Sequence, residues 1–196
     1  KEIPAYIVNQ VCGSGIRSIS SGFQSINSKD SKIVVAGGQE SMSLAPHAIH
    51  LRDGKKLGDT DLVDTMIKDG LWDAFHGYHM GITAENVAEK FQVTRDQQDK
   101  FALKSQEKAL KAQKENKFLN EIVNFKIKSK KAQIDFNMDE HPRTGINLEA
   151  LSRLKPVFKD EGTVTAGNAS GINDGAAAVT LMSSEEAEKR GIQKLV

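Results

Sequence analysis

The strand, helix and strand patterns in the first forty residues constrain the fold more than any other feature of this sequence. Residues 5–8 form a short apolar run, and the small residues of 12–15 interrupt it. Apolar residues then recur at helical spacing over 16–26, before a second strand predicted at 33–36, which we expect the glycines at 37–38 to end. A strand, a helix and a strand in this order make a βαβ unit, which normally belongs to a parallel sheet. The sequence therefore predicts an α/β fold.

The last thirty-five residues resemble the first forty in composition and in their predicted elements. Residues 163–175 are crowded with Gly, Ala, Ser, Asn and Thr, a composition that suits tight backbone packing or a bound ligand. Residues 176–182 predict a buried strand of small residues. Ser183 and Glu186 form a capping box, and Gly191 stands where a glycine ends a helix.

The stretch between these segments, roughly residues 40–160, predicts an insertion into the α/β core. Thr94 and Gln97 form a capping box, and we expect a helix from there to about Asn116. The inner face of this helix is predicted to hold Phe101, Ala109 and Ala112. Two alternating segments predict half-exposed strands, and leucines at helical spacing before Pro156 predict a short helix. These three segments are 122–127, 134–138 and 148–154.

Composition excludes several classes of protein. The 27 Lys and Arg nearly balance the 26 Asp and Glu, so the formal net charge of +1 gives no argument for nucleic-acid binding. No apolar run approaches the roughly 18 residues of a membrane span. The single cysteine excludes an intramolecular disulfide and a cysteine-based zinc cluster, and a free thiol fits a reducing, cytoplasmic location. Because the first residue is Lys and no signal peptide follows, we expect the chain to begin inside a longer protein.

Cys12 is the candidate catalytic residue, because it lies where the first predicted strand meets the following helix. With Gly13, Ser14 and Gly15 it resembles a nucleophile elbow. Glycine adopts backbone angles that are costly for residues with a Cβ, and it lets a substrate carbonyl approach. The amino end of a helix carries about half a positive charge, which lowers the pKa of a cysteine from about 8.5. The alternative is a buried structural cysteine, the usual state of a free thiol.

A base for Cys12 is not evident from the sequence. All five histidines lie in the insertion, and their spacing is compatible with a Cys–His pair without indicating one. His47 and His50 are three residues apart, but no carboxylate and histidine motif of metal-site spacing accompanies them, so no metal site is predicted. The five histidines are His47, His50, His76, His79 and His141.

Four motifs resemble those of the thiolase family, in that family's order and spacing, and the resemblance covers essentially the whole chain. They correspond to the active-site segment, to the next strand and loop, and to two later motifs. The His79-Met80 pair is similar to that of the short-chain, biosynthetic acetyl-CoA acetyltransferases, the acetoacetyl-CoA thiolases. The matching segments are 9–15, 35–43, 77–81 and 162–171, the last continued by 173–177.

The resemblance implies part of a layered αβα core interrupted by an α+β loop domain. Residues 1–40 would be the core segment that carries the nucleophile, and 166–196 would be the return to the core. Residues 41–165 would be the inserted loop domain, which binds CoA and makes oligomer contacts. Within it, residues 41–65 match the stretch that relatives use for tetramer contacts, so a homo-oligomer, dimer or tetramer, is expected.

The resemblance also implies a two-step reaction. The thiolate of Cys12 would attack acetyl-CoA and become acetylated, and a second acetyl-CoA, deprotonated at its methyl carbon, would attack that thioester to give acetoacetyl-CoA. The reverse direction is thiolysis by CoA. Covalent catalysis splits one hard condensation into two easier steps. CoA and acetyl-CoA would be substrates, and no tightly bound cofactor is expected.

The resemblance implies a CoA site built from the insertion and the segment after it. Its members would be Leu71, His79, Met80, Arg143, Phe158, Ala166 and Ser170. Arg143 would offer charge to the nucleotide phosphates, Ser170 would hydrogen-bond a pantetheine amide, and the large apolar members would pack on the adenine or pantetheine. On local grounds alone, an ordinary core or surface role is the favoured interpretation of each residue. A run of lysines is predicted to be a solvated strand face, with a weak role toward CoA phosphate or an oligomer as the alternative: Lys126, Lys128, Lys130 and Lys131.

This sequence departs from the family in one respect: thiolases have two similar α/β halves, and only the first is matched here. The family's Asn-Glu-Ala-Phe motif, Gly-His-Pro histidine and second cysteine have no counterpart in this sequence. A condensation needs a base for the acetyl methyl and stabilisation of the developing enolate. We therefore expect an acetyl-CoA acetyltransferase as the intact protein and no activity from these 196 residues alone. The alternatives are a truncated, non-catalytic CoA-binding remnant and a relative specialised for longer acyl chains.

Overall fold

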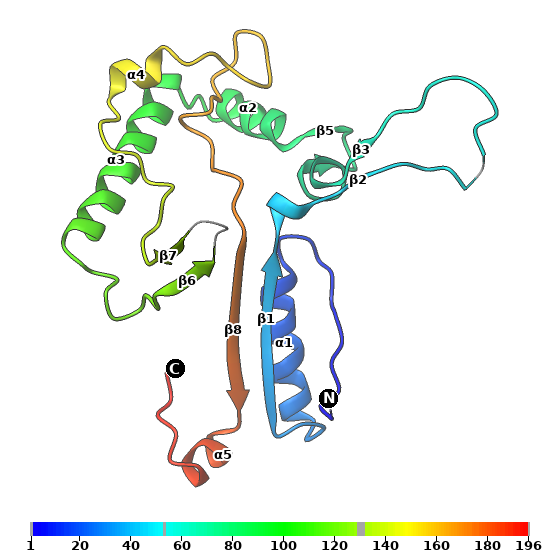
Figure 1. Ribbon diagram of the computed structural model, residues 1–196, viewed down its shortest axis with the longest axis vertical. Coiled ribbons are helices and arrows are strands. Elements are labelled where there is room, and N and C mark those ends of the chain that lie inside the picture. Colours follow the sequence, from blue (N-terminus) through cyan, green and yellow to red (C-terminus); the bar gives the residue numbers. More distant parts are fainter. Residues whose placement is uncertain (1, 53, 129–131, 196) are drawn as a thin grey trace. The chain divides into compact units, whose positions relative to one another are not determined.

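The computed structural model describes residues 2–52, 54–128 and 132–195. The chain divides into two compact units (Figure 1): unit 1 comprises Lys1–Trp72 and Ile172–Val196, and unit 2 comprises Asp73–Gly171. The predicted segments 1–40, 41–165 and 166–196 stay a prediction.

Unit 1 is built on a helix and a two-stranded sheet. Helix α1 (Ser14–Asn27) is followed by strand β1 (Ile33–Glu40). Strand β8 (Gly175–Met182) pairs with β1 in antiparallel register from Ile33 opposite Met182 to Glu40 opposite Gly175. The two segments that share the α/β style of sequence are therefore hydrogen-bonded to each other, although the whole of unit 2 separates them along the chain.

Small residues let α1 approach this sheet closely. A Cβ on Gly22 would lie 2.9 Å from Leu181 Cδ1 and 3.0 Å from Val34 Cγ1, so only glycine fits there without a shift of its neighbours. One turn nearer the amino end of α1, the Ser18 hydroxyl donates a hydrogen bond of 2.8 Å to the carbonyl of Gly37. The amino end of α1 is thereby fixed beside the carboxyl end of β1.

Four expectations for unit 1 are wrong. Residues 5–8 have no regular secondary structure and no strand partner among the described residues, and Ile7 is 97% exposed. Without that strand there is no βαβ unit, and β1 pairs antiparallel with β8. The glycines at 37–38 do not end β1, because their backbone groups continue the ladder with β8 to Glu40. Residues 175–180 of β8 are exposed, since neither their outer face nor their outer edge is covered.

The remaining elements of unit 1 are short. Strands β2 (His47–Ala48) and β3 (Val63–Asp64) pair antiparallel, and the 3₁₀ turn η1 (Met42–Leu44) and the π-helical segment η2 (Met66–Leu71) flank them. Helix α5 (Ser184–Lys189) follows β8. Half of the predicted capping box is present, because Ser183 caps α5 by accepting from the Glu186 N–H, whereas the Glu186 carboxylate accepts from Arg190 Nε at 2.6 Å. Gly191 ends the helix with a φ of 64°, as predicted.

The described residues of unit 2 form three helices and a pair of antiparallel strands. These are α2 (Met80–Lys90), α3 (Arg95–Lys114), α4 (Leu148–Ser152), and the paired strands β6 (Phe125–Lys128) and β7 (Gln133–Phe136). Strands β4 (Trp72–Asp73) and β5 (Tyr78–His79) precede α2. None of the helices in the described parts of the chain is long and apolar enough to cross a membrane.

The sequence located α3 correctly, and Ala109 and Ala112 of its predicted inner face are half-buried. The capping box of Thr94 and Gln97 is present in both directions. Phe101, however, is 78% exposed, and the residue of α3 that is buried is Asp99. Lys126 and Lys128 are exposed on β6, as predicted for a solvated face, whereas Lys130 and Lys131 lie outside the described residues.

Candidate active site

Cys12 lies on a tight turn that leads directly into α1, and it is exposed. The Gly13 N–H donates to the carbonyl of Gln10 at 2.9 Å, and the Ser14 N–H donates to the carbonyl of Val11 at 3.1 Å. These two bonds close the turn around Cys12. The structure therefore excludes the buried structural cysteine that the sequence left open.

The backbone strain of this turn is at Val11 and not at a glycine. Gly13 has an ordinary φ of −84°, whereas Val11 has a φ of 48°. A left-handed conformation is unusual for a β-branched residue, and such strain is concentrated at functional sites. The expectation that the glycines adopt the costly angles is thus wrong. Gly13 instead makes a close approach, because a Cβ there would lie 3.3 Å from the Gln10 carbonyl oxygen.

Side chains on either side of Val11 hold it in that conformation. Asn9 Oδ1 accepts from the Val11 N–H at 2.9 Å. The Ser14 hydroxyl accepts from the Gln10 N–H at 2.8 Å and donates to the Val11 carbonyl at 2.7 Å. No side chain caps the amino end of α1, so the positive end of the helix dipole is directed toward the turn that carries Cys12.

A second group of predicted residues meets at the start of α2 in unit 2. His79 caps α2, its Nδ1 accepting from the Gly81 N–H at 2.9 Å. Its ring stacks on Phe158 with centroids 4.7 Å apart and an interplanar angle of 20°. Gly81 makes this stack possible, because a Cβ there would lie 2.3 Å from the Phe158 ring. Met80 is adjacent and 45% exposed, so an apolar surface is available beside the stack.

The loop of residues 162–171 carries the predicted contacts Ala166 and Ser170, both exposed. It has no regular secondary structure, and buried carboxylates hold it instead. Glu85 on α2 is 4% exposed and accepts from the Val164 N–H at 2.7 Å, from the Thr163 N–H at 2.8 Å and from the Thr163 hydroxyl at 2.8 Å.

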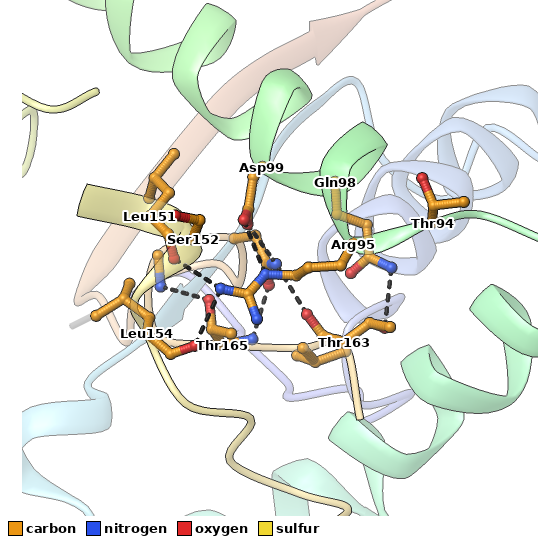
Figure 2. Close-up of polar contacts among 12 residues, drawn as sticks. Thr94, Arg95, Gln98, Asp99, Leu151, Ser152, Leu154, Thr163 and Thr165 are labelled. Atoms are coloured by element: carbon orange, nitrogen blue, oxygen red, sulfur yellow. Dashed lines mark hydrogen bonds and ion pairs between the residues drawn. The ribbon is translucent and has the colours of Figure 1, made fainter. Parts of the chain in front are cut away.

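A second buried carboxylate, Asp99 on α3, holds the other part of the loop (Figure 2). It accepts from Arg95 Nε at 2.8 Å and from Asn168 Nδ2 at 2.9 Å. The amide oxygen of Asn168 accepts in turn from the Thr165 N–H at 2.8 Å. Thr165 is fully buried, so each side of Ala166 is anchored in unit 2.

The charge of Glu85 is maintained by these donors. Burial alone raises the pKa of Glu85, but the N–H groups of Val164 and Thr163, the Thr163 hydroxyl and the positive charge of Lys159 together hold it below its ordinary value. Gly162 permits the close approach of the loop, since a Cβ there would lie 2.4 Å from Glu85 Oε1. The carboxylate is therefore ionised at neutral pH while it is buried.

The other two predicted CoA contacts, Leu71 and Arg143, belong to neither of these groups. Leu71 is half-buried at the end of η2 and belongs to unit 1, with Cys12. Arg143 is exposed in unit 2, and its backbone N–H donates to Gln106 Oε1 at 3.0 Å. The structure thus brings His79 together with Phe158, and Ala166 with Ser170 on one loop.

The remaining histidines do not form a metal site. His76 Nδ1 lies 2.8 Å from Asp73 Oδ2, and His47 Nε2 lies 3.9 Å from Asp64 Oδ2. The hydrogen bond to His76 is the largest cause of a lowered pKa of Asp73. Within the ranges that the structure describes, no group of three His, Cys, Asp or Glu side chains is placed to hold a metal ion.

Sequence reasoning missed Glu85, Asp99, Arg95 and Asn168. One signal was available for Glu85. Gly81, Glu85 and Ala88 recur at the spacing of one helix face, and all three are buried. A carboxylate on an otherwise small and apolar face indicates a buried charge that needs partners. The sequence holds no such signal for Asn168, whose partners are far away along the chain.

Comparisons with known proteins agree with these observations. A family model described as "Thiolase, N-terminal domain" matches residues 1–185. The acetyl-CoA acetyltransferase of Rhizobium meliloti is 57% identical over 195 residues, and that of Shinella zoogloeoides is 56% identical over 195 residues. Both matches cover 100% of this chain and 50% of the relative. The chain thus spans about half the length of the curated relatives it matches.

Solved structures give the same result for the fold. The acetyl-CoA acetyltransferase from Syntrophomonas wolfei is 43% identical with a TM-score of 0.91, over 96% of this chain and 48% of that one. Human mitochondrial 3-ketoacyl-CoA thiolase is 41% identical with a TM-score of 0.89, over 97% of this chain and 48% of that one. The α/β fold class predicted from the sequence is confirmed, and the chain belongs to the thiolase family.

Proposed function

We propose that this chain is the acyl-accepting part of an acetyl-CoA C-acetyltransferase. The observation that carries the proposal is the exposed Cys12 on a strained turn at the uncapped start of α1. The curated relatives that match over the whole chain at 56–57% identity are named acetyl-CoA acetyltransferase, which supports acetyl-CoA as the substrate.

The first chemical step follows from the position of the thiol. The Cys12 thiolate attacks the carbonyl carbon of acetyl-CoA, an S–C bond to Cys12 forms, and the S–C bond to CoA breaks. CoA leaves as its thiolate and takes up a proton. In the second step, the carbanion of another acetyl-CoA attacks the acetyl-enzyme, releasing acetoacetyl-CoA and regenerating the Cys12 thiolate. The reverse of the second step is thiolysis.

CoA is the proposed substrate, and no tightly bound cofactor is invoked. The apolar surface of Met80 and the His79–Phe158 stack supports a role in packing against pantetheine or adenine. The exposed Ser170 hydroxyl is proposed to hydrogen-bond a pantetheine amide beside Ala166. Arg143 is proposed to face the nucleotide phosphates, and Leu71 to contribute apolar surface to the same ligand.

The second step is not expected from these 196 residues alone. Within the described residues of unit 1, no histidine is hydrogen-bonded to the Cys12 thiol. A condensation requires a base that removes a proton from the acetyl methyl group. Acetylation of Cys12, the first step, is therefore the activity to measure in this chain.

The test is the intact mass of the chain after incubation with acetyl-CoA. Because Cys12 is the only cysteine, a gain of one acetyl group that hydroxylamine removes identifies a thioester at that residue. Cys12→Ser is the matched control, since a hydroxyl at this position gives no thioester. CoA should also slow the alkylation of Cys12 by iodoacetamide. Slowed alkylation without acetylation would favour a non-catalytic CoA-binding remnant, and the absence of both effects would refute the proposal.

Two further proposals concern the assembly and the location of the protein. Residues 41–65 expose large apolar side chains between β2 and β3, among them Leu57 at 93% and Leu62 at 61%, which supports a role in forming a homotetramer. Relatives from rat and mouse are named as cytosolic, which supports the cytoplasm. Light scattering of the wild-type chain and of Leu57→Asp would test the first point, with a smaller particle expected for the variant.

A further inference from the structure

We propose that Glu85 is a positioning residue for the pantetheine arm of CoA, acting through the loop of residues 162–171. The inference rests on the proposed function, since it assumes that this loop contacts CoA. Glu85 itself lies beneath the loop and is 4% exposed, so it is not expected to touch the ligand. Its effect is to determine which backbone groups of the loop are available.

At the centre of the loop, both backbone groups of Ala166 are without a partner among the described residues. In the described part of the chain, every N–H from Thr163 to Ala169 is hydrogen-bonded except that of Ala166. The Ala166 carbonyl also has no partner there, and the residue is exposed. An exposed N–H and C=O on a fixed backbone match the C=O and N–H of an amide, the group that pantetheine carries twice.

Two carboxylates fix the backbone on either side of that residue. Glu85 accepts from two consecutive N–H groups, those of Thr163 and Val164, at 2.7–2.9 Å. Asn168 follows Ala166 in the chain; its side chain donates to Asp99 and accepts from the Thr165 N–H. Hydrogen bonds to ionised acceptors are about twice as strong as neutral ones. The buried negative charge of Glu85 is therefore the device that orders an irregular loop before the ligand arrives.

Replacing the Glu85 carboxylate by an amide would replace one hydrogen-bond acceptor by a donor. In Glu85→Gln the side chain has the same shape, but its NH₂ group would face the Thr163 and Val164 N–H groups, which also donate. The loop would then populate its binding conformation only part of the time. If that population falls to about a tenth, the apparent Kd of CoA rises about tenfold.

The experiment compares two ligands on the whole 196-residue chain. Titration calorimetry would measure Kd for CoA and for 3′-phosphoadenosine 5′-phosphate, the nucleotide fragment that lacks pantetheine. Glu85→Gln should weaken CoA about tenfold and leave the fragment unchanged, because the loop serves only the pantetheine arm. Amide hydrogen exchange at Thr163 and Val164 should become faster in the variant.

The matched control is Glu89→Gln, the same substitution one turn later on α2. Glu89 is 74% exposed and makes only a surface ion pair with Lys159 at 3.3 Å, so this variant should bind both ligands like the wild type. Should Glu85→Gln fail to fold by circular dichroism, Asn168→Ala carries the same prediction, since it releases the Thr165 side of the loop.

The outcomes separate the inference from the function on which it rests. A wild-type chain that binds CoA no more tightly than the fragment would overturn the proposed function and the inference with it. Tight CoA binding that is equally tight in Glu85→Gln would overturn the inference alone. Equal weakening of CoA and of the fragment would also overturn it, because that result indicates a general structural role and not a positioning role.

Discussion

Replacing Arg95 by Met removes the positive partner of a buried carboxylate, and the structure shows what this change costs. Arg95 Nε donates to Asp99 at 2.8 Å, and one terminal nitrogen of Arg95 donates to the carbonyls of Leu151 at 2.6 Å and Leu154 at 3.0 Å (Figure 2). In Arg95→Met the Asp99 carboxylate, 5% exposed, keeps the neutral Asn168 amide as its one partner among the described residues.

The magnitude follows from burial. Removing one partner of a buried ion pair costs about 3–5 kcal/mol. Arg95 is 24% exposed, so we expect the lower end, about 3 kcal/mol. The same helix offers a matched control in Lys100→Met. That change breaks the ion pair of Lys100 with Asp96, which also joins residues four apart at 2.7 Å but is 59% and 65% exposed. An exposed pair of this kind contributes about 0.3–0.5 kcal/mol.

The assay is urea unfolding of the wild-type chain and the two variants, followed by far-ultraviolet circular dichroism. We expect a large decrease in the free energy of unfolding for Arg95→Met and almost none for Lys100→Met. A domain has a total stability of roughly 5–15 kcal/mol, so the first decrease is easily measured. Equal losses in the two variants, or a loss below about 1 kcal/mol for Arg95→Met, would refute the reasoning from burial.

Three further predictions concern other positions. The pKa of Glu85 lies below its ordinary value in the folded chain, so its contribution to stability is present at neutral pH and is lost as the pH falls through that lowered pKa. In Glu85→Gln, the free energy of unfolding should therefore fall less steeply with acid than in the wild type. An unchanged decrease at acid pH would contradict this. Gly22→Ala should destabilise the chain by about 1–2 kcal/mol in urea despite a better helix propensity, because its Cβ would crowd Leu181, whereas Gly15→Ala meets open space and should cost nothing. Gly81→Ala should displace the Phe158 ring from the His79 ring and weaken CoA binding, which titration calorimetry would measure. An unchanged affinity for CoA would argue against a role of the stack.

Local signals in the sequence predicted the elements that depend on local interactions. The helix expected over residues 16–26 is α1, and the capping box of Thr94 and Gln97 begins α3. The position of Cys12 at a turn before a helix was also predictable, because its neighbours are small and the residue period changes there, whereas its exposure came from the structure. Such signals act over a few residues and need no knowledge of the rest of the chain.

The errors share a different cause, which is dependence on distant partners. Residues 5–8 have the composition of a strand, but among the described residues no other strand lies beside them, so no ladder forms. The partners of Glu85 are 78 and 79 residues away along the chain. Phe101 follows the apolar period of α3, yet it is exposed, and the buried residue of that helix is Asp99, which accepts from the distant Asn168 amide. The predicted CoA contacts came from family resemblance and not from local chemistry.

The pairing of β1 with β8 also determines when each part of the chain can fold. Ile33 and Met182 are about 150 residues apart in sequence, and closing so long a loop makes their contact slow to form. Unit 2 is one continuous segment, Asp73–Gly171, and it is complete before β8 is synthesised. On the ribosome, unit 2 is therefore expected to fold first, while β1 still lacks β8 as a partner and has exposed apolar residues. In nascent chains stopped before residue 175, protease resistance should be found in unit 2, and β1 should be a binding site for chaperones.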